Sequence, residues 1–128
     1  MYDLLSIMVS RIQVGCIAKS ESVRVPRSNV IIATLSKMLE LGYIHYFKLL
    51  NHRDILVGLK YFEHKPVIRR LVRISKPGKR IYYKIRNFSE MSGRNVQGFY
   101  LISTSRGLLT DQECLYYRVG GEPLLLVF

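Results

Sequence analysis

Acidic residues, cysteines and long hydrophobic runs are all scarce in this 128-residue sequence. The two cysteines, Cys16 and Cys114, stand far apart and outside any Cys-x-x-Cys or Cys/His cluster, so neither a zinc site nor a disulfide framework is indicated. The longest apolar run, "PLLLVF" at 123–128, is far shorter than the roughly 18 residues that span a bilayer. We therefore expect a protein without a metal, a cofactor or a transmembrane segment.

Alanine is also rare, and the N-terminus carries no visible targeting signal. Only Ala18 and Ala33 occur, whereas Ile, Leu, Tyr and Phe are abundant, which indicates an AT-rich genome such as that of an organelle. A helix-like apolar pattern begins at Tyr2, without a charged leader or a cleavage-site pattern. These features favour a protein made in the compartment where it works, with a mitochondrion preferred to a plastid or a bacterium.

The shortage of acids leaves the chain strongly basic. It has 20 Lys+Arg against 9 Asp+Glu, a formal net charge of +11 and a pI near 10.0. Half of the basic residues lie in segment 60–86, where Glu63 is the only acid. Aromatic residues are interleaved with them: Tyr61, Phe62, Tyr82 and Tyr83. Such a mixture can bind phosphates and stack on unpaired bases, although each ring can equally pack within a strand. A polyanionic partner is the natural inference.

Hydrophobic spacing divides the first half into alternating helices and strands. The chain is globular by composition, and its length suits one ordinary domain or two small ones. Apolar residues at helical spacing predict a helix over 2–18, and Ser28 is the expected cap of a second helix that stops at Gly42. Strands are predicted at 22–26, 43–50 and 54–62. The result is an α-β-α-β-β unit with its helices on one face of a small sheet.

The second half is predicted to be rich in β-strands. Two strands in 67–85 are joined by Lys76-Pro77-Gly78-Lys79, whose Pro-Gly centre suits a type II turn. Segment 87–98 is a polar loop with room for a helical turn, a strand follows from 99, and a last strand comes after Gly120-Gly121. The predicted fold class is α+β, with an N-terminal α/β subdomain at 1–64 and a β-rich C-terminal subdomain at 65–128.

The stretch "LISTSRGLLTD" places the hydroxyls of Ser103–Ser105 and the charge of Arg106 directly before Gly107. A serine nucleophile needs a base and an orienting carboxylate. The histidines all lie in the first half, at His45, His52 and His64, and no Gly-x-Ser-x-Gly elbow occurs. We therefore expect no serine hydrolase here. Hydroxyls both donate and accept hydrogen bonds, so this loop can instead contact a 2′-OH, a phosphate oxygen or a base edge of RNA.

Several motifs in order resemble one known family. "MYDLLSIMVSRI", "VPRSN" and "MLELGYI" are followed by "SKPGKRIYY", "GFYLISTSRGLLTD" and a terminal "GGE" before an apolar strand. Together they are similar to the universal family of the eighth small-subunit ribosomal protein, in its bacterial or organellar form, over nearly the whole chain. The resemblance implies a two-domain, non-enzymatic protein that binds small-subunit ribosomal RNA directly in its central domain, lies among other small-subunit proteins and supports assembly and translation. No homo-oligomer is expected.

The resemblance also implies where RNA binds, with the C-terminal subdomain as the main binding region. The hydroxyl loop is the principal reading element, the Pro-Gly turn and the tyrosine after it lie near the same RNA helix, and a C-terminal glutamate contributes. Glu122 can accept a hydrogen bond from a guanine or cytosine amino group, or simply pair with a nearby cation. Weaker candidates form a second surface in the first half. The candidate residues are Ser103, Thr104, Ser105, Arg106, Gly107, Lys76, Pro77, Gly78, Lys79, Arg80, Tyr82, Glu122, Arg11, Gln13, Arg27 and Ser28.

The chain departs from the family pattern at a few positions. Cys114 and Leu115 stand where a small residue is usual, and Val14 stands where bacterial relatives typically have Asn. Pro123 interrupts the last strand and can remove a ladder hydrogen bond. A free-standing RNA-binding translational regulator would share the charge and the hydroxyl loop, so it stays open as an alternative. A peripheral membrane protein is disfavoured, because no basic run forms a helix with an opposing apolar face.

Overall fold

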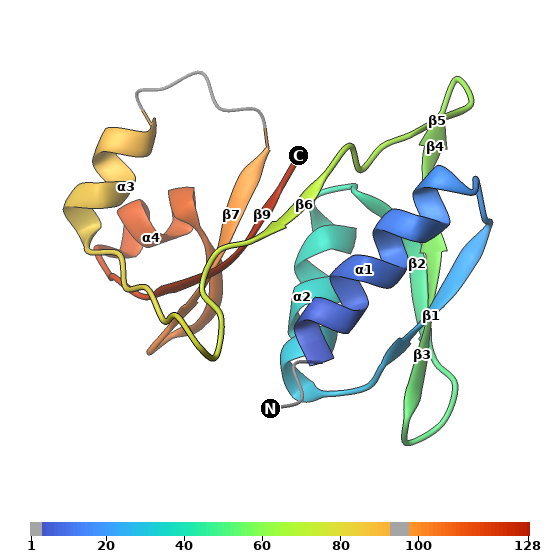
Figure 1. Cartoon of the computed structure of the whole chain (residues 1–128). Helices are drawn as coiled ribbons and strands as arrows, with labels where there is room; N and C mark the ends of the chain where they lie inside the picture. The colour runs from blue at the N-terminus through green and yellow to red at the C-terminus, as the bar shows by residue number, and fades with distance from the viewer. Residues whose placement is uncertain (1–3, 93–97) are drawn as a thin grey trace. The chain divides into compact units, whose positions relative to one another are not determined.

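The computed structural model describes residues 4–92 and 98–128. It divides the chain into two compact units, Met1–Arg70 (unit 1) and Leu71–Phe128 (unit 2), whereas the sequence placed the division at 64/65. Helices and strands occur in both units (Figure 1), so the predicted α+β class is confirmed. In the described part of the chain, no helix is long and apolar enough to cross a membrane.

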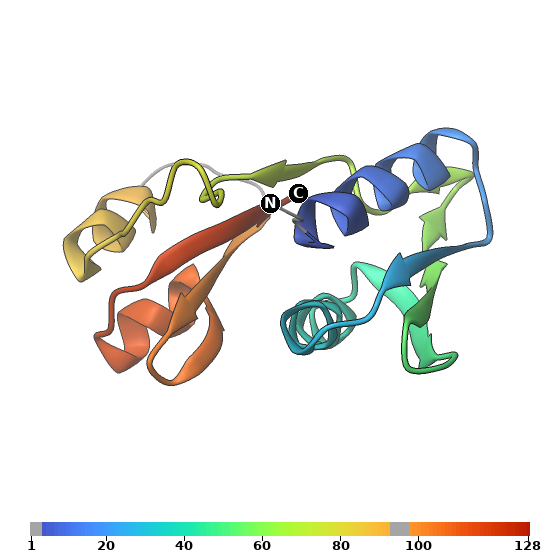
Figure 2. The ribbon, with the colours of Figure 1, turned by 60° about the horizontal axis from the view of Figure 1, so that its bottom comes forward.

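Unit 1 is a three-stranded antiparallel sheet with two helices. Its elements are α1 (Leu4–Ile17), β1 (Ser22–Pro26), α2 (Asn29–Glu40), β2 (Ile44–Leu49), β3 (Asp54–Leu59), β4 (Tyr61–Phe62) and β5 (Lys65–Pro66). The predicted α-β-α-β-β order is therefore confirmed, and the short β4–β5 hairpin follows it. The sheet order is β1-β3-β2, and both helices lie on one side of it (Figure 2).

Apolar spacing explains how these helices attach to the sheet. Ile31, Leu35 and Met38 are fully buried at intervals of four and three residues, so they share the face of α2 that packs inward. Burial of each such side chain contributes about 1.5–3 kcal/mol. As predicted, Ser28 caps α2, because its hydroxyl accepts a hydrogen bond from the Ile31 amide at 3.2 Å. The chain then leaves the helix through Gly42, which has a φ of +82°.

Unit 2 is a four-stranded antiparallel sheet with two further helices. Its elements are β6 (Leu71–Arg73), α3 (Ile85–Ser92), β7 (Phe99–Thr104), β8 (Gly107–Thr110), α4 (Asp111–Tyr117) and β9 (Glu122–Val127). The sheet order is β6-β9-β7-β8, so the last strand of the chain pairs on both sides. The helices α3 and α4 lie beside each other (Figure 1), and a buried cluster joins them to β7 and β8 through Phe88, Ile102, Leu109 and Cys114.

The strand predicted after the Pro-Gly turn does not form. Tyr83 makes one isolated pairing with Gly121, and Ile85 already begins α3. Neighbouring backbone amides bind side chains instead of a ladder: Ile81 donates to the Ser75 hydroxyl at 3.1 Å, and Lys84 donates to the Asn87 side-chain oxygen at 2.8 Å. Helix α3 therefore occupies the start of the predicted polar loop. Part of that loop, 93–97, lies outside the described residues.

The type II assignment of the Pro-Gly turn is also wrong. The turn itself is present, because Lys76 and Lys79 exchange two backbone hydrogen bonds of 3.1 and 3.0 Å. Gly78, however, does not adopt the positive φ that the third residue of a type II turn requires. A Cβ added at Gly78 would meet no atom within 4 Å, so neither backbone conformation nor space requires a glycine here.

Helix α4 was not predicted, although the sequence carries a signal for it. Thr110 and Glu113 form a capping box, in which each side chain accepts from the other residue's amide at 3.2 Å. The same segment contains the buried Cys114, so the cysteine occupies a core position. Pro123 is accommodated at a shift in the β7–β9 register between Leu101 and Ile102, where the ladder is locally irregular.

Removing the α4 cap is expected to destabilise the protein. Thr110→Ala should lower the free energy of unfolding by about 1 kcal/mol, because the Glu113 amide at the helix start loses its hydroxyl acceptor. Thr110→Ser keeps the acceptor and should stay near the wild type in urea denaturation. Equal losses for the two variants would show that the methyl group, and not the cap, stabilises this helix.

The Cys114 thiol is expected to make stability depend on alkaline pH. Burial, with the nearby Asp111 and Glu113 carboxylates, raises the pKa of Cys114 from 9.0 to about 11. The folded protein therefore keeps the thiol proton between pH 9 and 11 while the unfolded chain releases it, so this contribution to stability declines over that range. Wild type should lose stability relative to Cys114→Ala as pH rises from 8 to 11. A constant difference between them would refute this.

Candidate RNA interface

The hydroxyl stretch lies at the end of the β7–β8 hairpin. Thr104 pairs with Gly107, so Ser105 and Arg106 form a two-residue connection. The Thr104 hydroxyl donates to the Gly107 carbonyl at 2.8 Å and accepts from the Arg106 amide at 3.1 Å. Gly107 has a φ of +99°, a conformation that side-chain-bearing residues rarely adopt. Of the three hydroxyls, that of Thr104 therefore stabilises the loop itself.

The two serines occupy more open positions. Ser103 and Ser105 are both exposed. Ser103 lies opposite Glu122 in the β7–β9 register, and directly opposed residues project from the same face of a sheet. The space about the Cα of Gly107 is also open, because a side chain there would meet no atom within 4 Å. The hairpin end therefore presents hydroxyls and accessible backbone side by side with a carboxylate.

Arg80 connects the basic segment to this carboxylate. Its guanidinium nitrogen Nη1 lies 3.3 Å from Oε2 of Glu122. The Arg80 side chain is 72% exposed and that of Glu122 is 25% exposed, so the pair contributes little to stability. Its effect is positional: the residue that pairs with Ser103 across the β7–β9 ladder also has a cationic partner within the fold.

The two tyrosines of "RIYY" have different surroundings. Tyr83 exchanges backbone hydrogen bonds of 2.9 and 3.0 Å with Gly121, and its ring packs at edge-on angles against Phe88 and Tyr100. Tyr82 is 66% exposed. Of the two, Tyr82 thus remains available for contact with a partner, while Tyr83 anchors the segment to the start of β9.

The Pro-Gly turn is held beside β9 by one buried serine. Ser75 is 2% exposed; its amide donates to the Pro123 carbonyl at 3.0 Å, and its hydroxyl accepts from Ile81. The four residues that follow, 76–79, are all exposed. Two lysines are therefore presented to solvent on a turn that a hydrogen-bonded core residue fixes in place.

The candidates in unit 1 mainly support their own backbone. Arg11 donates to the Arg24 carbonyl at 3.1 Å, Arg27 donates to the Asn51 carbonyl at 2.9 Å, and Ser28 caps α2. Each of these side chains already has an intramolecular partner, which gives it a structural role apart from any RNA contact.

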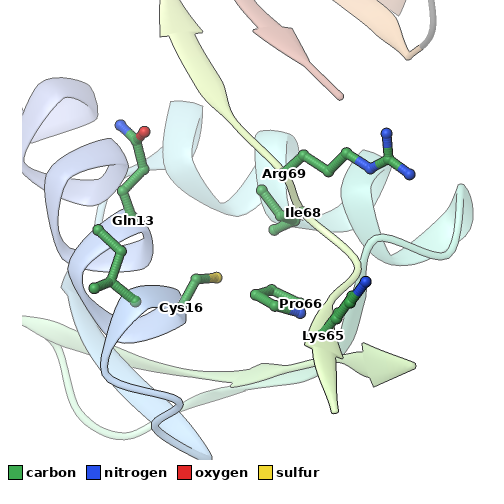
Figure 3. A pocket seen from close by; sticks show the side chains of 7 residues that line it. Gln13, Cys16, Lys65, Pro66, Ile68 and Arg69 are labelled. Carbon is green, nitrogen blue, oxygen red and sulfur yellow. The ribbon is translucent and has the colours of Figure 1, made fainter. Parts of the chain in front are cut away.

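Gln13 lies at a pocket of about 460 Å³ within unit 1 (Figure 3). Side chains from α1 form one side, and the segment around β5 forms the other. The lining residues are Gln13, Cys16, Ile17, Lys65, Pro66, Ile68 and Arg69. The pocket combines apolar side chains with the cations of Lys65 and Arg69. Their positions in the sequence did not indicate that these residues lie together with Gln13.

Sequence reasoning missed the residues that support the hairpin from α4. The guanidinium carbon of Arg106 lies 4.9 Å from the centre of the Tyr117 ring. The capping box at Thr110 was the available signal, because it marks the start of the helix that carries Tyr117. Among the described residues, no three His, Cys, Asp or Glu side chains gather to bind a metal ion.

Similarity to known proteins extends over nearly the whole chain. Residues 3–128 match the family model described as ribosomal protein S8. The chain is 39% identical over 125 residues to the small ribosomal subunit protein uS8m of Acanthamoeba castellanii, with 98% of each chain covered. It is 40% identical over 129 residues to uS8 of Zymomonas mobilis, covering 98% of this chain and 97% of that protein. With the motifs and the two-unit fold, these matches show that the chain belongs to the ribosomal protein S8 family.

Proposed function

We propose that this constituent of the small ribosomal subunit binds small-subunit ribosomal RNA directly, in the central domain of that RNA, and supports assembly and hence translation. Neighbouring small-subunit proteins complete its surroundings. The likeness to uS8m of Acanthamoeba castellanii supports a mitochondrial ribosome as its location. One observation carries the RNA proposal: exposed hydroxyls, a carboxylate and cations share one end of the unit 2 sheet. Ser103 pairs with Glu122 across the β7–β9 ladder, and Glu122 binds Arg80. Ser105 and Arg106 form the adjoining hairpin connection.

The chemistry of this surface suits an irregular RNA helix. Small hydroxyls can approach a shallow minor groove closely and exchange hydrogen bonds with 2′-OH groups and base edges. The Glu122 carboxylate can accept from a base amino group but repels phosphates, so it contributes selectivity. The exposed lysines of the Pro-Gly turn attract the phosphate backbone without reading sequence. Specificity is thus assigned to the hairpin end and general affinity to the basic segment.

A free-standing RNA-binding translational regulator would use the same surface. The match of residues 3–128 to a ribosomal protein family favours the ribosomal role. Sedimentation of organelle extracts separates the two: a ribosomal constituent follows the small subunit through high-salt washing, whereas a regulator is released.

Direct recognition is tested by titrating the purified protein with a central-domain helix and with a scrambled duplex of equal length. We expect a preference of at least about a hundredfold for the central-domain helix. Affinity for both should fall by about 0.7–0.9 log units per phosphate contact for each log unit of salt. Equal binding to the two RNAs would contradict direct recognition, and binding independent of salt would exclude the basic segment as the docking surface.

Two single substitutions should separate specificity from affinity. Ser105→Ala is expected to cost about 1–3 kcal/mol on the central-domain helix and little on the scrambled duplex, because a polar contact is left unmade. Lys79→Ala should weaken both RNAs by a similar, smaller factor, since it removes charge alone. The measurement is the affinity of each variant for each RNA. If both variants lost equally on both RNAs, the division of roles would be wrong.

A further inference from the structure

We propose that Tyr116 and Tyr117, at the end of α4, extend the RNA interface. In this arrangement Tyr117 is a positioning residue that orients Arg106, and Tyr116 offers its ring as a stacking surface to an unpaired base. The inference rests on the proposed function, because it names further contacts of the same site. Neither tyrosine was among the residues that the family resemblance suggested.

The geometry links the hairpin to both rings in sequence. The Arg106 guanidinium lies over the Tyr117 ring at 4.9 Å, and the Tyr117 ring meets that of Tyr116 edge-on, with centres 5.0 Å apart and planes at 89°. Thr104 holds the Arg106 amide from the other side of the loop. The side chain that follows Ser105 is therefore constrained through both its backbone and its guanidinium.

Exposure distinguishes the two rings. Tyr117 is 43% exposed, whereas Tyr116 is 81% exposed, the second highest value among the large apolar and aromatic side chains identified as exposed in the described residues. A ring so open adds little to the core, yet it touches a neighbour that contacts an exposed cation. Arg118, also exposed, ends the helix in the left-handed conformation and adds a second positive charge next to the pair. The rings thus form a continuous group with cations, unlike a scattered surface side chain.

The chemistry of this group suits single-stranded or bulged nucleotides. The guanidinium carbon of Arg106 lies over the Tyr117 ring in a cation–π contact, and the N–H groups of a guanidinium can in addition donate to a phosphate. A tyrosine ring can stack on any base, and such a contact contributes about 1–3 kcal/mol per base. An RNA helix with unpaired bases supplies both partners, because its splayed nucleotides present a base and a phosphate close together.

The stacking role of Tyr116 is tested with two RNAs, a central-domain helix that keeps its unpaired nucleotides and the same helix made fully paired. Tyr116→Ala should weaken binding to the first about 5- to 100-fold and leave the second nearly unchanged. Tyr116→Phe keeps the ring and should bind both RNAs like the wild type. Circular dichroism of each variant checks that the fold is intact.

The possible outcomes separate this inference from the proposed function. If wild type prefers the central-domain helix over a scrambled duplex but Tyr116→Ala equals wild type on every RNA, the stacking role is overturned and direct RNA recognition stands. If wild type shows no preference, both fall. A loss shared equally by Tyr116→Ala and Tyr116→Phe also overturns stacking, since the phenylalanine ring would have replaced it.

The positioning role of Tyr117 is tested by a double-mutant cycle with Arg106. Arg106→Gln should reduce the salt slope of binding by about one contact, and Tyr117→Leu should reduce it partly. The double variant should be no weaker than Arg106→Gln alone, because Tyr117 acts through the guanidinium. Strictly additive losses, or a salt slope that Tyr117→Leu leaves unchanged, would show that Tyr117 does not orient Arg106.

Discussion

The pairing of β9 with strands on both sides is the interaction on which unit 2 depends. This last strand of the chain lies between β6 and β7, so β6 joins the sheet only when the C-terminal strand is in place. Two segments that are not strands also form backbone hydrogen bonds with the beginning of β9. Tyr83 binds Gly121, and Ser75 binds the Pro123 carbonyl. Gly121 is required at this crossing, because a side chain there would place its Cβ 2.3 Å from the Ser103 carbonyl oxygen.

This constraint explains why the candidate RNA-binding residues of unit 2 lie together. Glu122 opens β9 and faces Ser103 across the β7–β9 ladder, while the Ser75 and Tyr83 contacts hold the Pro-Gly turn and Arg80 near the same strand end. Residues more than forty positions apart in the sequence thereby share one surface. On this surface the Thr104 hydroxyl already makes two hydrogen bonds within the hairpin. The exposed Ser103 and Ser105 are therefore the hydroxyls with room for a partner. The net positive charge of the protein adds a weak, salt-screened attraction to a polyanion over a longer range.

The sequence by itself determined much of this protein. The helical periodicity of unit 1, the Ser28 cap and the final apolar strand were readable because each depends on neighbours close in the chain. The excess of basic residues and the hydroxyl stretch indicated an RNA partner for the same reason, since residue type alone carries that chemistry. Helix α4 also has a local signal, because Thr110 and Glu113 have the spacing of a capping box.

Only the tertiary structure decided how these pieces meet. Segment 80–84 has the composition of a strand, yet its amides bind the Ser75 hydroxyl and the Asn87 side chain, and those partners cannot be inferred from local propensity. Likewise, Tyr82 and Tyr83 are identical in type, and packing against Phe88 makes Tyr83 partly buried while Tyr82 stays exposed. Strand register sets Glu122 opposite Ser103, and the packing of α4 against β7 and β8 brings the Tyr117 ring to Arg106. Residue types and short motifs therefore identified the candidate residues, and packing between segments distant in the sequence decided which of them share a surface.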